Sequence, residues 1–481
     1  MTDVNKAIQP VEIKHKAPIN AGSTFKYGNY IQFFIGASDV GMWLVNDSYL
    51  KLDLHVAASA ANAIHYTNKT GANLADGANL TGNLSINTYI RNAANLFDRV
   101  EILQNSRVIY HEEHFIESNT IEQLELSEDY MRVNPQMYTT TNMAKTGNCL
   151  LRIQNTANTT SAAVNDNTDG TSTRGVQTIK DILIPANRIM RIFQDMTSEG
   201  FPIFALTSPI ELRLYIAQPW RYLVDYCDKI GDFGTHTATN ANIRLTDAIR
   251  TRFGNDTIEI KDVDLVMSHY IPNEVERSAA TAKINSSGET YRYRMIKTAF
   301  RSEAVGANSS VSIPFTLNTS NVSSLLLWGH KTDLSPGIMY RPNLHSLYIQ
   351  FGANQLPKQP YPNNSFEYPY DYRYGVDDVM NSIDTYYSQT NFDLNNSYKF
   401  IAKGTHDTAV TVPTSSYVMM GANYVNDPEK FGSNSKAWNG QYQVHFMNDN
   451  PDSFSDINFC LSVITEYGMR FKDGTLETRN I

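Results

Sequence analysis

Hydrophobic and polar residues alternate along several stretches of the chain, which is the pattern of β-strands with one buried face. In the segment 49–56, Leu or Val occupies every even position from 50 onward, whereas Lys51, Asp53 and His55 occupy the odd ones. The segment 210–216 (IELRLYI) repeats the pattern, and the longest case runs from 457 to 471. These segments predict strands that pack one face against a core.

Helical spacing is sparse. Apolar residues recur at i, i+3, i+4 and i+7 over 376–383, which predicts one short helix. Thr120 followed by Gln123 resembles a capping box, so a second short helix is predicted to open at Thr120. The sequence therefore predicts a mainly β protein with short helices.

Long polar segments interrupt the predicted strands at 67–83, 155–173, 279–289 and 404–416. Loops longer than about 12–15 residues are uncommon in compact domains unless they are functional or mobile. The pattern predicts a sandwich decorated with long polar loops at one end.

The two halves of the chain resemble each other. The segments 99–110 and 344–357 both read as strand, short turn and strand, and each is followed by one of the predicted helices. Matching elements recur at an offset of roughly 210–250 residues, which fits a duplicated β-sandwich better than a solenoid. The predicted domains are an N-terminal arm (1–30), a first sandwich (31–219), a linker (220–256) and a second sandwich (257–481).

Composition narrows the class of protein. The 28 Tyr and 21 Phe are too many for a disordered chain, and no run approaches the ~20 apolar residues of a membrane span. The first residues lack the pattern of a signal peptide, and three distant cysteines suit free thiols in a reducing compartment. A formal charge of −9 argues against binding nucleic acid over the whole surface. We therefore expect a soluble protein made inside a cell.

Three segments resemble one known family. They are NAANLFDRVEILQNSRVIYHEEHF (92–115), FPIFALTSPIELRLYIAQP (201–219) and INFCLSVITEYGMRFKDGTLET (457–478). Together with the duplicated pattern, they are similar to the double-jelly-roll major capsid proteins of adenovirus, virophages and polinton-like or adinto-like viruses. The resemblance covers the chain from about residue 30 to the end, as a pattern of elements without a diagnostic motif.

The resemblance implies two tandem eight-stranded jelly rolls in a homotrimer of pseudo-hexagonal outline. Such trimers tile an icosahedral shell that encloses a DNA genome, so the protein is expected in the virion after assembly in the cytoplasm or nucleus of the host cell. The implied partners are other copies of the chain, neighbouring capsomers, penton proteins and minor or cement proteins. An enzymatic role is not expected.

A tyrosine-rich segment, 361–374, is the main candidate for a subunit interface, because Tyr is enriched in protein interfaces. Packing against its own sandwich and stacking on sugars are the alternatives. The interface candidates are Trp220, Tyr361, Phe366, Tyr368, Tyr370, Tyr372 and Tyr374.

The arm and the loops give two further sets of candidates. A slightly basic N-terminus is often only a frayed end, but the resemblance implies that it faces the interior and contacts genome, inner membrane or a minor protein. The interior-facing candidates are Lys6, Lys14 and Lys16, and the outer-loop candidates are Asn73, Asn155, Asp166 and Asp169.

Motifs for chemistry are weak. His111 and His114 in the sequence HEEH stand at i and i+3 after a strand, whereas the zinc-protease motif requires i and i+4 on a helix, so a polar strand end is favoured over a metal site. The loop 165–170 faintly resembles a calcium loop, but Val176 stands where an EF-hand needs Glu. No phosphate-binding loop, dinucleotide fingerprint or nucleophile elbow occurs.

The sequence thus predicts no catalytic residue, metal, cofactor or specific small-molecule ligand. Two other functions stay open. A two-domain adhesin or tail-spike-like protein would hold glycans on its loops. A β-sandwich glycosidase would require an essential pair of carboxylates about 5–9.5 Å apart, which the sequence cannot locate.

Overall fold

The structure is a computed structural model that describes residues 10–20, 24–39, 41–56, 86–124, 126, 128–139, 150–153, 177–194, 200–227, 253–319, 322–332, 335–336, 344–363, 420–423, 440–448 and 457–480. Among these residues, no helix has the length and apolar character needed to span a membrane. The predicted helix at 376–383 lies outside the described residues.

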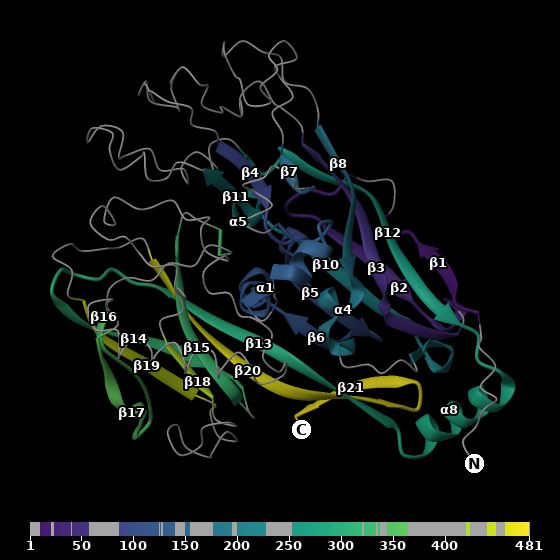
Figure 1. The fold of residues 1–481 in the computed structure, drawn as a ribbon. Coiled ribbons are helices and arrows are strands. Elements are labelled where there is room, and N and C mark those ends of the chain that lie inside the picture. Colours follow the sequence, from purple (N-terminus) through teal and green to yellow (C-terminus); the bar gives the residue numbers. More distant parts are fainter. Residues whose placement is uncertain are drawn as a thin grey trace, which may run out of the picture.

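The first sandwich has two antiparallel layers (Figure 1). One layer has the order β1 (Glu12–Lys16), β12 (Ile258–Tyr270), β3 (Met42–Val56) and β8 (Gln177–Pro185). The other has the order β2 (Tyr30–Ile35), β10 (Ile210–Ile216), β5 (Phe97–Gln104) and β6 (Arg107–Glu112).

The second sandwich is built in the same way. One layer has the order β13 (Glu289–Ser302), β20 (Ile457–Lys472), β15 (Val322–Lys331) and β18 (Met420–Asn423). The other has the order β14 (Ser309–Leu317), β19 (Gly440–Asn448), β16 (Leu344–Phe351) and β17 (Asn354–Asn363).

The two sandwiches have identical topology. When these eight strands are counted in chain order within each sandwich, the layers read first-eighth-third-sixth and second-seventh-fourth-fifth in both cases. This interleaved order is that of a jelly roll. The prediction of two tandem eight-stranded jelly rolls is confirmed.

Smaller elements complete the fold. β4 (Ile86–Ile90), β7 (Arg152–Ile153) and β11 (Leu223–Cys227) form a third sheet, β9 (Phe201–Pro202) pairs with β3, and β21 (Thr475–Asn480) pairs with β20. Within the described residues, the helices are α1 (Phe115–Leu124), α2 (Glu128–Val133), α4 (Ala186–Ile189), α5 (Pro219–Tyr222) and α8 (Glu274–Ser286). Short 3₁₀ turns occur at η1 (Ala37–Asp39), η2 (Ala93–Leu96), η3 (Arg191–Phe193) and η4 (Ile203–Ala205).

The alternating segments form strands with the predicted buried faces. Leu50, Leu52 and Leu54 on β3 have no exposed surface, and Leu212 and Leu214 on β10 are at most 1% exposed. Full burial of one such side chain contributes about 1.5–3 kcal/mol. The hairpin predicted at 99–110 also forms, and Asn105 and Ser106 supply the two positive φ angles of its turn.

Two local predictions were wrong. α1 begins at Phe115, five residues before the predicted start, and the Thr120 hydroxyl donates to the carbonyl of Ile116 (2.8 Å) instead of capping the helix. The segment 279–289 is not a loop, because α8 occupies most of it. Asn273 and Glu276 form the capping box of that helix.

Strand pairing also corrects the predicted boundaries. Residues 12–16 of the predicted arm form β1, an edge strand that pairs with β12. β12 in turn pairs with β3, so residues 258–270 belong to the first jelly roll and not to the second. The predicted linker, 220–256, therefore lies between the seventh and eighth strands of the first roll. Alternation along the chain shows that a segment is a strand, but it does not show which sheet the strand joins.

Candidate functional site

A buried polar cluster of the first roll lies at its junction with the second jelly roll. Figure 1 places α1 of the first roll next to β13 and β20 of the second. α1 follows β6, the fifth strand of its roll, and it carries Ser118, Asn119 and Glu122, which are all buried. This helix is therefore one of the elements of the first roll, together with η3, that contact the second roll.

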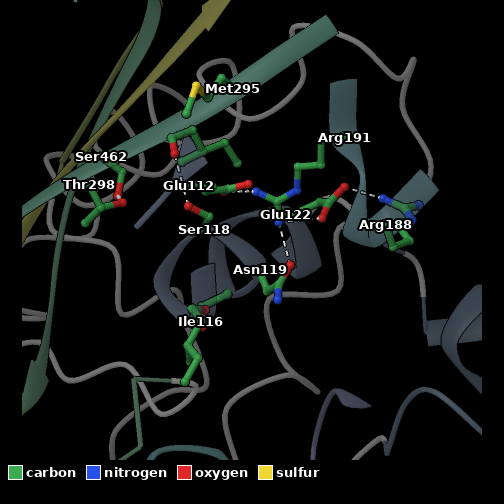
Figure 2. A network of polar contacts seen from close by, with 12 residues as sticks. Glu112, Ile116, Ser118, Asn119, Glu122, Arg188, Arg191, Met295, Thr298 and Ser462 are labelled. Carbon is green, nitrogen blue, oxygen red and sulfur yellow. Dashed lines mark hydrogen bonds and ion pairs between the residues drawn. The ribbon is translucent and has the colours of Figure 1, made fainter. Parts of the chain in front are cut away.

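Arg191 is the centre of the cluster, as Figure 2 shows. Its guanidinium forms ion pairs with Glu112, at the end of β6, and with Glu122 on α1 (3.0 Å). It also donates to the side-chain oxygen of Asn119, and its side chain is only 2% exposed. Arg188, one turn earlier in the chain, forms a second ion pair with Glu122.

The two buried carboxyls differ in their electrostatics. Burial raises the pKa of Glu112, and the nearby Arg191 offsets only part of this effect. Burial also acts to raise the pKa of Glu122, but Arg191 and Arg188 together outweigh it and leave this pKa below its ordinary value. Glu122 is therefore firmly ionised, whereas Glu112 depends on a single guanidinium for compensation.

Further hydrogen bonds extend the cluster toward the second roll. The Tyr110 hydroxyl donates to Glu112, and burial raises the pKa of that phenol well above its usual range. The Ser118 hydroxyl donates to the backbone carbonyl of Ile296 on β13 (3.0 Å). Tyr110 also packs edge-on against Tyr293 of β13, with ring centroids 6.0 Å apart.

The second roll contributes fully buried neutral side chains near the junction. Trp328 of β15 donates from Nε1 to the Ser462 hydroxyl on β20 (2.9 Å), which also bonds the Thr298 hydroxyl on β13 (2.7 Å). Trp328, Ser462 and the neighbouring Cys460 have no exposed surface. Strand alternation alone placed Ser462 on a solvent-facing side, yet the structure buries it completely.

The C-terminal hairpin β20–β21 forms a clasp on the first roll. The carbonyl oxygen of Gly474, in its turn, accepts hydrogen bonds from Thr207 N, Thr207 Oγ1 and Gln104 Nε2, each 3.1 Å long. The Leu476 amide donates to Gln104 Oε1 (2.7 Å), and the Leu476 side chain lies in the core of the first roll. Gln104 is 3% exposed, so both ends of its amide are satisfied inside the molecule.

Three of the predicted site residues have described side chains. Trp220, on α5, is half-buried against the first core and donates to Gln218 Oε1 (2.9 Å). Lys14 and Lys16, on β1, both form ion pairs with Asp39, which is 4% exposed. Burial alone would raise the pKa of Asp39, but the two lysines outweigh burial and lower it. Both lysines thus hold β1 in place, and their contact with genome or membrane stays a prediction.

One further candidate lies within the described part of the chain. Tyr361 is in β17, where its backbone pairs with Leu347. The remaining candidates lie outside the described residues: Phe366, Tyr368, Tyr370, Tyr372, Tyr374, Lys6, Asn73, Asn155, Asp166 and Asp169. Their roles stay predictions.

The residues that form the junction carry no local sequence signal. Glu112 stands out in the sequence only as part of HEEH. No local pattern marks Arg191, Trp328 or Gln104, because a single polar or aromatic residue beside an apolar strand carries no signal that it is buried. Among the described residues, no group of three or more His, Cys, Asp or Glu side chains is arranged to hold a metal ion. What this arrangement does is to fix two domains relative to each other.

No protein-family model matches this sequence, and no curated protein matches it. Solved structures do. A cryo-electron microscopy structure of the Sputnik virophage at 3.5 Å resolution aligns over 98% of this chain and 88% of its own, with a TM-score of 0.51 and 10% identity. The crystal structure of the mavirus major capsid protein aligns over 97% of this chain and 90% of its own, with a TM-score of 0.48 and 10% identity. The Faustovirus major capsid protein aligns over 98% and 93%, with a TM-score of 0.46 and 9% identity.

At such low identity, the likeness to the virophage structure concerns the fold. It agrees with the strand order found in both sandwiches. The chain has a double-jelly-roll fold.

Proposed function

We propose that the protein is a viral major capsid protein whose homotrimers tile an icosahedral shell around a DNA genome. The observation that carries the proposal is the repeated strand order in two jelly rolls, matched over 98% of the chain by a structure from the Sputnik virophage. The same match favours a capsid protein over a two-domain glycan-binding adhesin. The function in this proposal is geometric, and no catalytic step is part of it.

The junction supports this role physically. A shell subunit must keep a fixed shape, because a change in the angle between its two domains would misplace its neighbours. The hydrogen bond from Ser118 to the Ile296 carbonyl and the clasp at Gly474 both couple the rolls through buried contacts, which are costly to break singly. The two rolls therefore behave as one building block.

The partners in this proposal are other copies of the chain, neighbouring trimers, and penton and minor or cement proteins. Interfaces of obligate type commonly bury more than ~2,000 Å², and jelly rolls leave strand edges that such interfaces can cover. The segment 361–374 stays the proposed interface anchor, and the loop residues Asn73, Asn155, Asp166 and Asp169 stay proposed for the outer surface.

The first test is the mass and shape of the purified chain. Multi-angle light scattering is expected to give a species of three chains, and negative-stain class averages of the same peak should show a hexagonal outline. A chain that stays monomeric at all concentrations and binds glycans on an array would contradict the proposal and support the adhesin.

A second test concerns the N-terminus. Deletion of residues 2–9 removes Lys6 and spares β1, so trimers should form as before while shell assembly is impaired. Shells of normal yield and shape from the truncated chain would remove the N-terminal segment from the proposal.

A further inference from the structure

Glu117 of α1 belongs to a second ion-pair cluster, separate from that of Arg191. Arg221 on α5 donates from Nη1 to Asp98 on β5 and from Nη2 to Glu117 (2.5 Å). The side chains of Glu117 and Arg221 are 3% and 15% exposed, whereas that of Asp98 is 35% exposed. One guanidinium thus serves two carboxylates, and Asp98 is the one that solvent reaches.

The charges of this triad do not balance. In the cluster around Arg191, two guanidiniums face two carboxylates, whereas in the triad one guanidinium faces two. The Oε2 atom of Glu117 is buried, and no group in the described part of the chain donates a hydrogen bond to it. A buried carboxylate oxygen without a donor is costly, most of all when the group is ionised. The triad therefore carries one negative charge that nothing within it compensates.

The triad lies at the junction with the second roll. The hydroxyl of Ser335, which follows β15, donates to the backbone carbonyl of Arg221. Cys460 on β20 is a free thiol with no exposed surface. Burial raises the pKa of this thiol, the Glu117 carboxylate reinforces the effect, and the Arg221 guanidinium opposes it. The charges of the triad thus act across the boundary between the two rolls.

Three charged or titratable groups surround Asp98: Arg221, Glu117 and His114, which lies in the turn before α1. Burial raises the pKa of Asp98, Arg221 opposes this effect without cancelling it, and the Glu117 carboxylate reinforces it. The His114 ring packs edge-on against Phe300 of β13, with ring centroids 4.8 Å apart. Asp98 therefore binds a proton more readily than an isolated aspartate does.

We propose that the triad of Asp98, Arg221 and Glu117 is a proton-binding site that makes the junction between the two jelly rolls tighter in mild acid than at neutral pH. A proton from solvent binds a carboxyl oxygen of Asp98 and leaves Arg221 with Glu117 alone, so the charges then balance. When the pKa of a carboxyl is raised by folding, its contribution to stability is present below the unfolded value of about 3.9 and is lost as pH rises through the folded value. This pH dependence is a property of the single chain and does not rest on the proposed capsid function.

Chemical labelling of Cys460 reports opening of the junction, because its thiol has no exposed surface in the closed chain. D98N is compared with the wild-type chain at pH 7 and at about pH 4.5, with dithiodipyridine as the thiol reagent and peptide mass spectrometry to identify the labelled cysteine. The ratio of the two rates at one pH cancels the intrinsic reactivity of the thiol. D129N on α2 is the matched control, because Asp129 also pairs with an arginine (Arg132, 3.0 Å) but is 80% exposed.

At pH 7, Cys460 should be labelled more slowly in D98N than in the wild-type chain, by about threefold or more, because the amide removes the excess charge and still accepts from Arg221. At about pH 4.5 the two rates should approach each other, because the wild-type triad then binds its proton. D129N should match the wild-type rate at both pH values. E117Q balances the charges in the same way and should repeat the pattern of D98N.

Faster labelling of D98N at both pH values would show that Asp98 acts only as an ion-pair partner of Arg221, and it would overturn the inference. A ratio of rates that does not change with pH would overturn it as well. H114Q tests the other titratable neighbour of Asp98. The pH-dependent effect of D98N should persist in the H114Q background, and its disappearance there would place the proton on the imidazole and overturn the assignment to the carboxyl pair.

Discussion

Replacing Arg191 with Met would remove the positive charge that two buried carboxylates share. Arg191 and Glu112 have side chains only 2% and 1% exposed, so water cannot replace the lost partner. Removing one member of a buried ion pair typically costs about 3–5 kcal/mol, because the other charge stays buried without compensation. Glu122 keeps Arg188, so Glu112 is the group left uncompensated, and we expect a loss of ~3 kcal/mol at neutral pH.

The loss should depend on pH in a defined direction. Burial already raises the pKa of Glu112, and R191M should raise it further. A carboxyl whose pKa is higher in the folded than in the unfolded state binds its proton more tightly when folded. Its contribution to stability is present below the unfolded pKa of about 4.3 and is lost as pH rises through the folded pKa. The stability deficit of R191M should therefore shrink as pH is lowered from 7 toward 5.

Urea unfolding followed by tryptophan fluorescence at pH 7 and pH 5 measures both effects. R191M combined with E112Q should recover most of the loss, because a neutral amide replaces the buried charge. R213M is the control, since the ion pair of Arg213 with Glu211 (2.5 Å) lies on a sheet face where Arg213 is 30% exposed, and its loss should be below ~1 kcal/mol. A deficit of R191M that matched R213M, or that neither pH nor E112Q relieved, would refute this account of the cluster.

Three shorter predictions concern other parts of the fold, and urea unfolding measures each. G474A should lower the free energy of unfolding by about 1–3 kcal/mol, because φ is +73° at residue 474 and a Cβ there would lie 2.8 Å from a backbone oxygen of the first roll. An unchanged free energy of unfolding would mean that the clasp contributes no stability. L212A should cost about 2–5 kcal/mol by leaving a cavity at a site 1% exposed, and a cost below ~1 kcal/mol would contradict the assigned core. D39N should lower the free energy of unfolding by about 1–3 kcal/mol at pH 7. Because Lys14 and Lys16 keep the folded pKa of Asp39 below its ordinary value, the wild-type advantage should shrink as pH falls below about 4 and through the folded pKa, and an advantage that grew with falling pH would contradict this.

The strands were predictable from the sequence where one face of a sheet is buried and the other is exposed to solvent. Alternation located β3, β10 and β20, and the turn residues Asn105 and Ser106 located a hairpin. What alternation could not supply was the partner of each strand. β12 pairs with β1 and β3 across long stretches of chain, and no local pattern encodes such pairing.

The junction was beyond local prediction for a related reason. Ser462 follows the alternation of an exposed position, yet it is fully buried, and its hydroxyl bonds Thr298 and Trp328 from neighbouring strands. Arg191 stands in a run of apolar residues, and its two carboxylate partners lie 79 and 69 positions earlier in the chain. Such a cluster exists only after the whole roll has formed.

The pairing of β1 with β12 also constrains the order of events during synthesis. Glu12 lies opposite His269. After Glu12, 257 further residues (269 − 12) must therefore be translated before β1 can pair with β12, its only strand partner within the described chain. Contacts between such distant residues form slowly, because the loop must close before the pairing can compensate for the lost entropy. Translation at about 5–20 residues per second makes this delay ~10–50 seconds. During that interval, the edge of β3 that later pairs with β12 is unpaired on the nascent chain. Other nascent chains on the same messenger RNA expose the same edge.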